Sequence, residues 1–244
     1  MPILEIKNLV KQFDGVQAVD HLSLAIEKGR ITGIIGPNGS GKTTLINLLS
    51  GIFPVDSGEV IIEEAQKFRR IIAHQISFYG ITRTFQSVRL FEQMTVLDNI
   101  LVVLTERHVF SSLFEKHTEY HIKEAKKVLE KIDLWEKRNQ LAINLSYGQR
   151  KLLEIARTLA TQSNIYLFDE PFAGLFPVMR KIVASIIQEL KQENKTVILI
   201  EHDMGLIREL CDYIFVLDEG KLLAEGQPDR VLEKREVINI YLGG

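Results

Sequence analysis

Eight consecutive residues have the types and the spacing of a loop that binds phosphate. They fit the pattern G-x-x-x-x-G-K-[ST] and are followed by Thr44: Gly36, Pro37, Asn38, Gly39, Ser40, Gly41, Lys42 and Thr43. The backbone N–H groups of such a loop converge on phosphate oxygens at a helix N-terminus, and its glycines let the backbone approach without a Cβ. Lys42 would reach the β- and γ-phosphates, and the Thr43 hydroxyl would bind Mg²⁺. The sequence therefore predicts a nucleoside triphosphate site, with Lys42 solvated when no nucleotide is bound.

The residues on either side of this loop supply the structural context that it requires. The apolar run Ile31–Ile35 precedes it and is typical of a buried strand. Leu45, Ile46, Leu48 and Leu49 follow it with the spacing of a helix. A strand, a glycine-rich loop and a helix in this order favour nucleotide binding over a chance match to the pattern.

Two carboxylates follow a second apolar run and are candidates for the chemistry of hydrolysis. Asp169 and Glu170 come directly after Ile165–Phe168. Asp169 is expected beside the phosphate loop, where it would hold Mg²⁺ directly or through water. Glu170 is expected to accept a proton from the water that attacks the γ-phosphate. The alternative is a solvated loop, which is the more common setting for an isolated Asp-Glu pair.

The segment Leu145–Gln149 precedes an apolar-periodic helix and has two interpretations. In the simpler one, Ser146 is an N-cap residue and Gly148 eases the turn. In the other, Ser146, Gly148 and Gln149 form a second phosphate-binding helix N-terminus. One ATP cannot meet both this segment and Lys42 within one chain if they lie on separate subdomains, but it can if two chains dock head to tail.

Composition and charge narrow the class of protein. The 244 residues are 45% hydrophobic and 25% charged, with a formal net charge of −2, which gives no overall attraction to nucleic acid or to an acidic membrane. Met1 leads directly into a strand pattern, so no secretory signal is expected. A single cysteine, Cys211, cannot form a disulfide within the chain, so a buried thiol in a reducing cytosol is expected. The longest apolar stretch, Ile100–Leu104, is too short to cross a bilayer, so a membrane role requires a partner.

Hydrophobic periodicity predicts α/β organisation with a helical block inside it. Continuous apolar strands between helices indicate a largely parallel, buried sheet. The helical block extends from about Ser87 to Thr161. A capping box at Thr95–Asp98 predicts the start of a helix within it. The expected strands are 3–7, 22–26, 31–35, 59–62, 165–168, 196–200, 214–217 and 222–224. The expected helices outside the block are 178–193 and 204–211.

These motifs occur in the order and spacing of the ATPases of ATP-binding-cassette (ABC) transporters, which the chain resembles from about Ile3 to Leu242. The resemblance implies a RecA-like P-loop ATPase core with an antiparallel β-subdomain (1–86 and 162–244) and an inserted helical subdomain (87–161). It implies that two cassettes sandwich two ATP molecules, each held between the phosphate loop of one chain and Leu145–Gln149 of the other. It also implies ATP and Mg²⁺ as cofactors.

Three further site residues are implied by the resemblance alone. Phe13 resembles the aromatic residue that stacks on adenine, although a core phenylalanine beside a β-turn is the alternative. Gln86 resembles the glutamine that contacts Mg²⁺ and the attacking water and moves with the membrane subunit; otherwise it is a surface residue. His202 resembles the histidine that contacts the γ-phosphate, although an isolated histidine is usually structural.

Within the family, several strings are most similar to the ATPases of branched-chain amino acid importers: Arg83-Thr84-Phe85-Gln86, Val88-Arg89-Leu90-Phe91, Leu145–Gln149 and Glu201-His202-Asp203-Met204. This implies integral-membrane permease partners, a second ATPase subunit that is identical or heterologous, and a peripheral position on the cytoplasmic face of the membrane. The alternatives are a lipopolysaccharide or lipid exporter and a urea-type importer. An ABC ATPase that acts on nucleic acid is disfavoured, because the chain has neither a long coiled-coil insertion nor a basic patch. A generic P-loop kinase or GTPase leaves Leu145–Gln149 unexplained.

One position departs from the family pattern. After Ala173-Gly174-Leu175 the family normally has Asp or Asn in a loop that touches the opposite nucleotide site. This chain has Phe176, followed by Pro177, which suits the first turn of a helix. Phe176 is expected either to bury apolar surface across the interface between two cassettes or to pack in the core beneath that helix.

Overall fold

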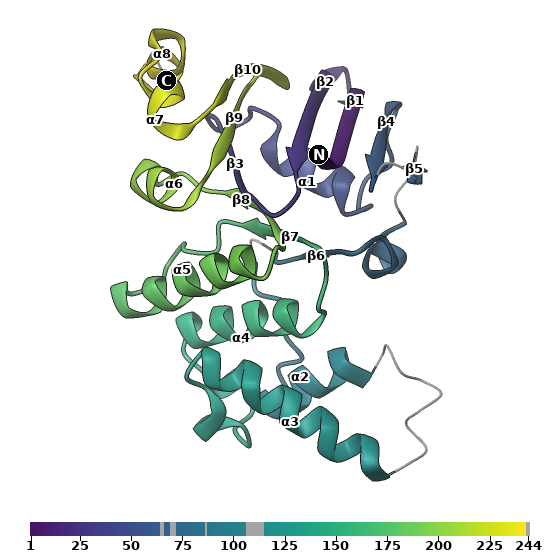
Figure 1. The fold of residues 1–244 in the computed structure, drawn as a ribbon, viewed down its shortest axis with the longest axis vertical. Coiled ribbons are helices and arrows are strands. Elements are labelled where there is room, and N and C mark those ends of the chain that lie inside the picture. The colour runs from purple at the N-terminus through teal and green to yellow at the C-terminus, as the bar shows by residue number, and fades with distance from the viewer. Residues whose placement is uncertain (64–65, 69–71, 86, 106–114, 243–244) are drawn as a thin grey trace. The chain divides into compact units, whose positions relative to one another are not determined.

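The computed structural model describes residues 1–63, 66–68, 72–85, 87–105 and 115–242, which form two compact units (Figure 1). The first unit comprises Met1–Arg83, Asn164–Glu170 and Ile187–Gly244. The second comprises Thr84–Ser163 and Pro171–Ile186. The core predicted from the sequence, in contrast, includes all of 162–244.

A six-stranded sheet lies at the centre of the first unit. Its strand order is β10-β9-β3-β8-β7-β6; all neighbours are parallel except β9 and β10, which are antiparallel. Every residue of β3, β7 and β8 is buried, as the continuous apolar runs predict. The strands are β3 (Ile31–Ile35), β6 (Ile81–Arg83), β7 (Ile165–Asp169), β8 (Thr196–Ile200), β9 (Tyr213–Asp218) and β10 (Lys221–Gly226). The prediction of a largely parallel sheet is confirmed.

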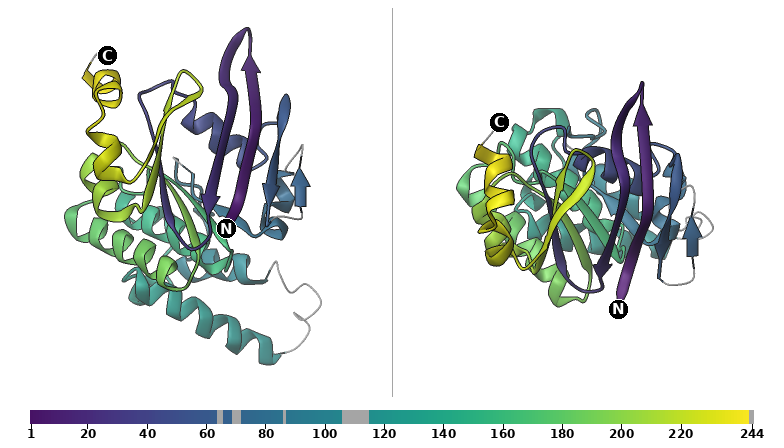
Figure 2. Two further views of the ribbon diagram at one scale, coloured as in Figure 1. Left: turned by 45° about the horizontal axis from the view of Figure 1, so that its top comes forward. Right: turned by 90° about the horizontal axis from the view of Figure 1, so that it is seen from above.

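A four-stranded antiparallel sheet, in the order β2-β1-β4-β5, completes the strands of this unit. Figure 2 shows β1 and β2 as a long hairpin. Both strands extend beyond the predicted 3–7 and 22–26, because irregularities in their pairing carry the ladder past polar residues to the turn at Asp14-Gly15. The strands are β1 (Pro2–Phe13), β2 (Val16–Glu27), β4 (Ser57–Ile62) and β5 (Gln66–Phe68).

The helices of the first unit are α1 (Lys42–Leu49), α6 (Met204–Leu210), α7 (Pro228–Leu232) and α8 (Arg235–Leu242). The apolar side chains of α1 are fully buried in one core with residues of both sheets, such as Leu9 and Ile198. This packing fixes the start of α1, and therefore the loop before it. Cys211 is buried after α6, and burial raises the pKa of its thiol to about 12, as expected for a structural cysteine.

The second unit is helical. Its helices α2 (Val96–Thr105), α3 (Glu115–Lys131) and α4 (Tyr147–Ala160) pack against one another, and α5 (Pro177–Gln192) begins here. The predicted capping box at α2 is present: the Asp98 N–H donates to the Thr95 hydroxyl at 3.1 Å, and the Asp98 carboxylate accepts from the Thr95 N–H at 3.3 Å. Among the described residues, no helix is long and apolar enough to cross a membrane.

Candidate functional site

The carboxyl ends of three parallel strands bring the predicted catalytic segments of the first unit together. The loop Gly36–Gly41 follows β3, Asp169 ends β7, and His202 lies just after β8. These strands are neighbours in the order β3-β8-β7. Ligands of open α/β sheets bind at such a strand edge, because the loops that follow parallel strands converge there.

Lys42 folds back over the phosphate loop instead of extending into solvent. Its Nζ donates to the carbonyl oxygens of Gly36 and Pro37, both at 2.8 Å, and to the Ser40 hydroxyl at 3.2 Å. The residue is 6% exposed. Burial lowers the pKa of Lys42, and the carboxylates of Glu170 and Asp169 oppose that shift. The prediction that Lys42 is solvated without nucleotide is therefore wrong, because the loop carbonyls supply the hydrogen-bond partners that water would otherwise provide.

This geometry changes the expected effect of Lys42→Ala. The substitution removes the charge that would meet the phosphates, so ATP affinity should fall by about ten- to a hundredfold, the equivalent of a charge-assisted hydrogen bond. It also leaves two loop carbonyls without their donor, which costs about 1–3 kcal/mol of unfolding free energy. Fluorescent-nucleotide titration and urea denaturation measure the two effects. Lys28→Ala, at an exposed position beyond β2, is the control. Unchanged ATP affinity would contradict the phosphate-loop assignment.

Two loop glycines are required by the protein's own packing. Gly36 has φ +151°, and a Cβ there would lie 2.1 Å from the Leu217 carbonyl oxygen. Gly41 has φ +97°, and its Cβ would lie 2.4 Å from the Ala18 carbonyl oxygen. Both contacts are with backbone, which cannot move aside, so the loop excludes larger residues before any ligand is considered.

Phe13 is a partly exposed ring held at the end of β1. It is 37% exposed, and its ring lies 5.0 Å from that of Phe53 in an edge-to-face arrangement. The Nζ of Lys11 lies 5.1 Å from the Phe13 ring centre and donates to Asp56 at 2.7 Å. The exposure contradicts a fully buried core phenylalanine and leaves a surface on which a flat base can stack.

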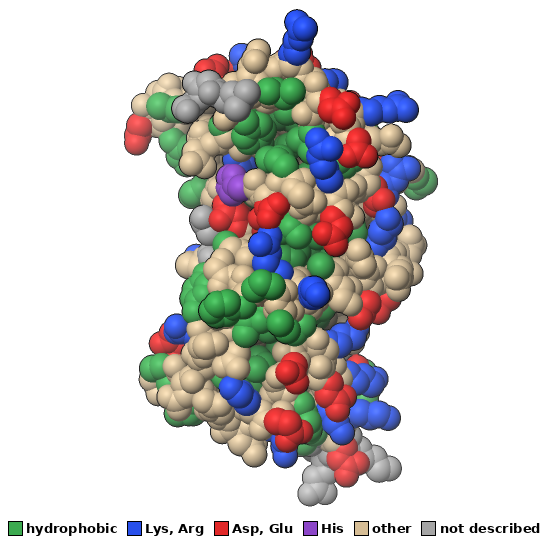
Figure 3. Space-filling model, turned by 90° about the vertical axis from the view of Figure 1, so that its left-hand side faces the viewer, with side chains coloured by type: hydrophobic (Ala, Val, Ile, Leu, Met, Phe, Trp, Pro, Cys, Tyr) green, Lys and Arg blue, Asp and Glu red, His purple; other side chains and the backbone are tan. Residues whose placement is uncertain are grey.

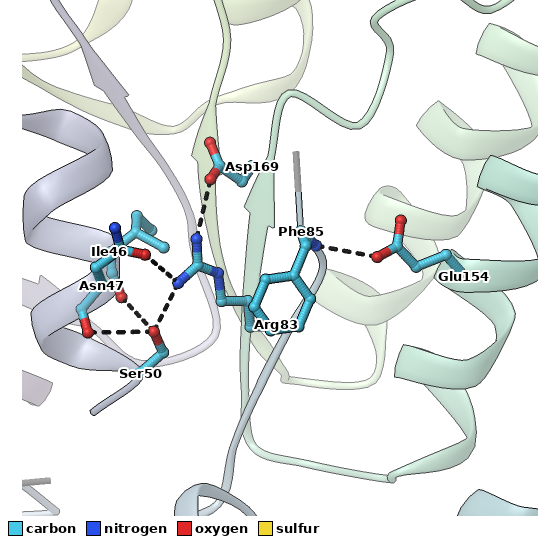
Figure 4. Close-up of polar contacts among 7 residues, drawn as sticks. All are labelled: Ile46, Asn47, Ser50, Arg83, Phe85, Glu154 and Asp169. Atoms are coloured by element: carbon cyan, nitrogen blue, oxygen red, sulfur yellow. Dashed lines mark hydrogen bonds and ion pairs between the residues drawn. The ribbon is translucent and has the colours of Figure 1, made fainter. Parts of the chain in front are cut away.

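Asp169 is buried at the end of β7, so the alternative of a solvated loop is wrong for this residue. It is 2% exposed and forms an ion pair with Arg83 on β6, Nη2 to Oδ2 at 3.1 Å (Figure 4). Nη1 of Arg83 donates to the side chains of Asn47 and Ser50 in and after α1, both at 2.7 Å. One guanidinium thus connects the carboxylate to the helix that begins at the phosphate loop. No local sequence pattern marks this contact: Arg83 stands out in the sequence only as part of a string of family resemblance.

Glu170 and His202 form a hydrogen-bonded pair. Nε2 of His202 lies 2.9 Å from Oε1 of Glu170. Glu170 has left-handed backbone geometry, φ +49°, and its N–H donates to the Ile200 carbonyl at 3.0 Å. A residue in this conformation breaks the alternation of the strand, so Glu170 departs from the path of Asp169. The structure therefore places a carboxylate and an imidazole in direct contact, so the imidazole can fix the orientation of the carboxylate.

In the second unit, Ser146–Gln149 forms the N-terminus of α4. The Ser146 hydroxyl accepts from the Gln149 N–H at 3.3 Å, and the Gln149 side chain accepts from the Ser146 N–H at 3.2 Å. This capping box confirms the simpler interpretation of the segment. A Cβ at Gly148 would lie 2.5 Å from Sδ of Met179, so this glycine also permits close packing against α5. The phosphate-binding role of the segment stays a prediction.

Phe176, which directly precedes α5, is exposed. It is 75% exposed, and Val178 in the first turn of α5 is 73% exposed. The alternative in which Phe176 packs in the core is therefore wrong, because nothing covers the ring within the chain as described. Gln86, the remaining predicted site residue, lies outside the described residues.

Charge is mixed on the surface that Figure 3 shows. Acidic and basic side chains are interspersed there, and apolar side chains cluster between them. This face therefore offers no surface of a single sign, in keeping with the net charge of −2.

A phosphate-binding type of loop after β3, a buried aspartate at the end of β7 in the same sheet and an adjacent glutamate–histidine pair are typical of a P-loop ATPase. Comparisons with known proteins agree. The sequence profile described as ABC transporter matches residues 19–173. The chain belongs to the ABC transporter family, as one of its ATP-hydrolysing cassette subunits.

Individual relatives extend this similarity over the whole chain. The high-affinity branched-chain amino acid transport ATP-binding protein LivG of Salmonella typhimurium is 39% identical, covering 99% of this chain and 98% of the relative. The corresponding protein BraF of Pseudomonas aeruginosa is 38% identical, with the same coverage. A nucleotide-free ATP-binding cassette from an ABC transporter superposes with a TM-score of 0.87 at 33% identity, over 100% of both chains. A dimeric cassette bound to ADP and Pi gives 0.81 at 26% identity, over 92% of this chain and 98% of that one. The predicted ABC ATPase fold is confirmed.

Proposed function

We propose that this chain powers the import of branched-chain or similar amino acids through separate permease subunits. The observation that carries the proposal is the near-complete alignment with LivG and BraF, whose names specify branched-chain amino acid transport. The chain would lie on the cytoplasmic face of the membrane, bound to its permeases. Its second cassette would be a copy of itself or a related chain.

In the proposed cycle, ATP binds between the phosphate loop of one cassette and Ser146–Gln149 of its partner. Phe13 stacks on the base, and Asn38, Gly39 and Thr44 complete the phosphate loop. Thr43 and Asp169 offer the hard oxygen donors that suit Mg²⁺, which would neutralise charge on the phosphates. Glu170 accepts the proton of the attacking water, and His202 holds Glu170 in place. Gln86 would report the state of the site to the permease.

Reconstitution tests the substrate. The chain would be produced with the permease and binding-protein genes that neighbour its own, and uptake of radiolabelled leucine into vesicles containing ATP would be measured. Leucine uptake that disappears with Glu170→Gln supports the proposal. ATP-dependent export of lipid, or uptake of urea without leucine, would assign the chain to one of the alternative transporters.

Ser146→Arg should abolish ATP-driven dimerisation while leaving ATP binding to the single chain intact. The arginine places bulk where the partner's γ-phosphate would approach. It also removes the N-cap of α4, which costs about 1 kcal/mol. Ser146→Ala is the matched control, since it loses the same cap without adding bulk and should still dimerise. Size-exclusion chromatography in Mg-ATP measures the effect. Weaker ATP binding by the single chain would indicate that Ser146 serves its own chain's nucleotide.

Phe176→Asn should raise the ATPase rate of the isolated protein with little change in ATP affinity. An asparagine at this position can form polar contacts across the two nucleotide sites, whereas phenylalanine can only bury apolar surface, worth roughly 1.5–3 kcal/mol. Because the ring is exposed, the unfolding free energy should change by less than about 0.5 kcal/mol. Val178→Asn is the control, because it also replaces an exposed apolar side chain with asparagine but at a position outside the predicted polar contact. Its ATPase rate should not rise. A slower Phe176→Asn enzyme would contradict the prediction.

A further inference from the structure

Glu154 is a buried carboxylate in the middle of α4. It is 5% exposed, and its Oε1 accepts a hydrogen bond from the Phe85 N–H at 3.2 Å (Figure 4). Its Oε2 is also buried and has no hydrogen-bond partner among the residues that the structure describes. An unsatisfied buried oxygen destabilises the folded protein, because it has lost its hydrogen bonds to water. A leucine or methionine would fill the same position without this cost, so stability alone does not account for a glutamate here.

Arg157, one helical turn after Glu154, contacts the same segment. Its Nη1 donates to the Arg89 carbonyl at 2.5 Å, and its guanidinium lies 4.9 Å from the Phe91 ring. The Arg89 guanidinium in turn lies 3.9 Å from the Phe85 ring. Residues three apart share one face of a helix, so Glu154 and Arg157 together hold the backbone at Phe85 and at Arg89. These two positions lie on either side of Gln86.

The carboxyl group of Glu154 titrates near neutral pH. Burial raises its pKa to about 7. The backbone amides of Phe85 and Arg89 and the charges of Lys151 and Arg157 oppose this shift. Lys151 donates to the Ala173 carbonyl at 3.2 Å, so its charge is also held in place. The ionised carboxylate accepts a stronger, charge-assisted hydrogen bond from the Phe85 N–H than the neutral carboxylic acid does.

We propose that Glu154 is a positioning residue for ATP hydrolysis: with Arg157 it holds the backbone at Phe85 and at Arg89, the described residues that flank Gln86 in the sequence. The inference rests on the proposed role of Gln86. Glu154 touches neither nucleotide nor water in this scheme and acts through the backbone that it holds. Its ionised form holds the segment more firmly, so hydrolysis accelerates as the carboxyl group loses its proton.

Glu154→Gln tests the proposal, because glutamine keeps the shape of the side chain and cannot ionise. The ATPase rate of the unaltered protein should show a step with a midpoint near pH 7. The variant should lack that step, and at about pH 8 its kcat should be about tenfold lower, the equivalent of one hydrogen bond. Its KM for ATP should not change. Glu130→Gln, an exposed carboxylate on α3 paired with Lys126, is the matched control.

Amide hydrogen exchange supplies a second measurement that does not depend on activity. At about pH 8, Glu154→Gln should exchange faster in the peptide containing residues 84–91 and at the normal rate elsewhere. Glu154→Asp, which keeps the charge, should retain the pH step with a lower rate. A step that persists in Glu154→Gln, or exchange that is faster throughout the second unit, would overturn the inference. Failure of the proposed function would instead appear as absence of amino acid uptake by the unaltered protein.

Discussion

Glu170→Gln is expected to slow ATP hydrolysis by about two orders of magnitude or more, the scale expected for loss of a general base. Glutamine can still hydrogen-bond His202, so the variant should fold normally and bind ATP as the unaltered protein does. Because the variant hydrolyses bound ATP slowly, the ATP-bound dimer should accumulate, and the fraction of dimer in Mg-ATP should rise. Phosphate release and light scattering measure the two effects.

Glu225→Gln is the control for this prediction, because it removes an exposed carboxylate from the same unit. Its hydrolysis rate should be unchanged. His202→Ala should lower the rate as well, since Glu170 would lose the imidazole that orients it. Normal turnover by Glu170→Gln would remove this residue from the mechanism and leave the Glu170–His202 pair as a structural contact.

Much of the fold was predictable because its elements have strong local patterns. Ile31–Ile35 and Ile165–Phe168 are largely apolar runs, which are typical of strands in a sheet covered on both faces. Strand β6 was missed because three residues carry no periodicity. Helices α7 and α8 near the C-terminal end were also missed.

The site was predictable only where its chemistry depends on residue type and spacing. The phosphate loop and Asp169-Glu170 follow strands in a recognisable order. The roles of Arg83 and Glu154 depend on burial, and charged residues are usually exposed, so no local pattern marks them. Likewise, the solvated state expected for Lys42 was wrong because carbonyl oxygens of Gly36 and Pro37, which the sequence does not place, surround its ammonium group.

Arg83→Met should lower the unfolding free energy by about 3–5 kcal/mol, because it removes the positive charge that forms an ion pair with the buried Asp169 carboxylate. That is a large fraction of the 5–15 kcal/mol that is typical of a folded protein. ATPase activity should fall with it, since Asp169 and α1 lose the guanidinium that connects them. Urea denaturation, with hydrolysis measured as a function of Mg²⁺ concentration, checks both effects.

A second pair within the same unit provides the control. Arg208 and Asp229 are 3.4 Å apart on the surface, and breaking an exposed pair costs only about 0–1 kcal/mol, so Arg208→Met should be nearly neutral. The double variant Arg83→Met with Asp169→Asn removes both buried charges. The double variant should lose less unfolding free energy than the two single variants lose in total, by about 1 kcal/mol or more, while hydrolysis stays abolished. If Arg83→Met costs no more than Arg208→Met, the guanidinium does not hold Asp169, and other contacts of that residue must set the position of its carboxylate.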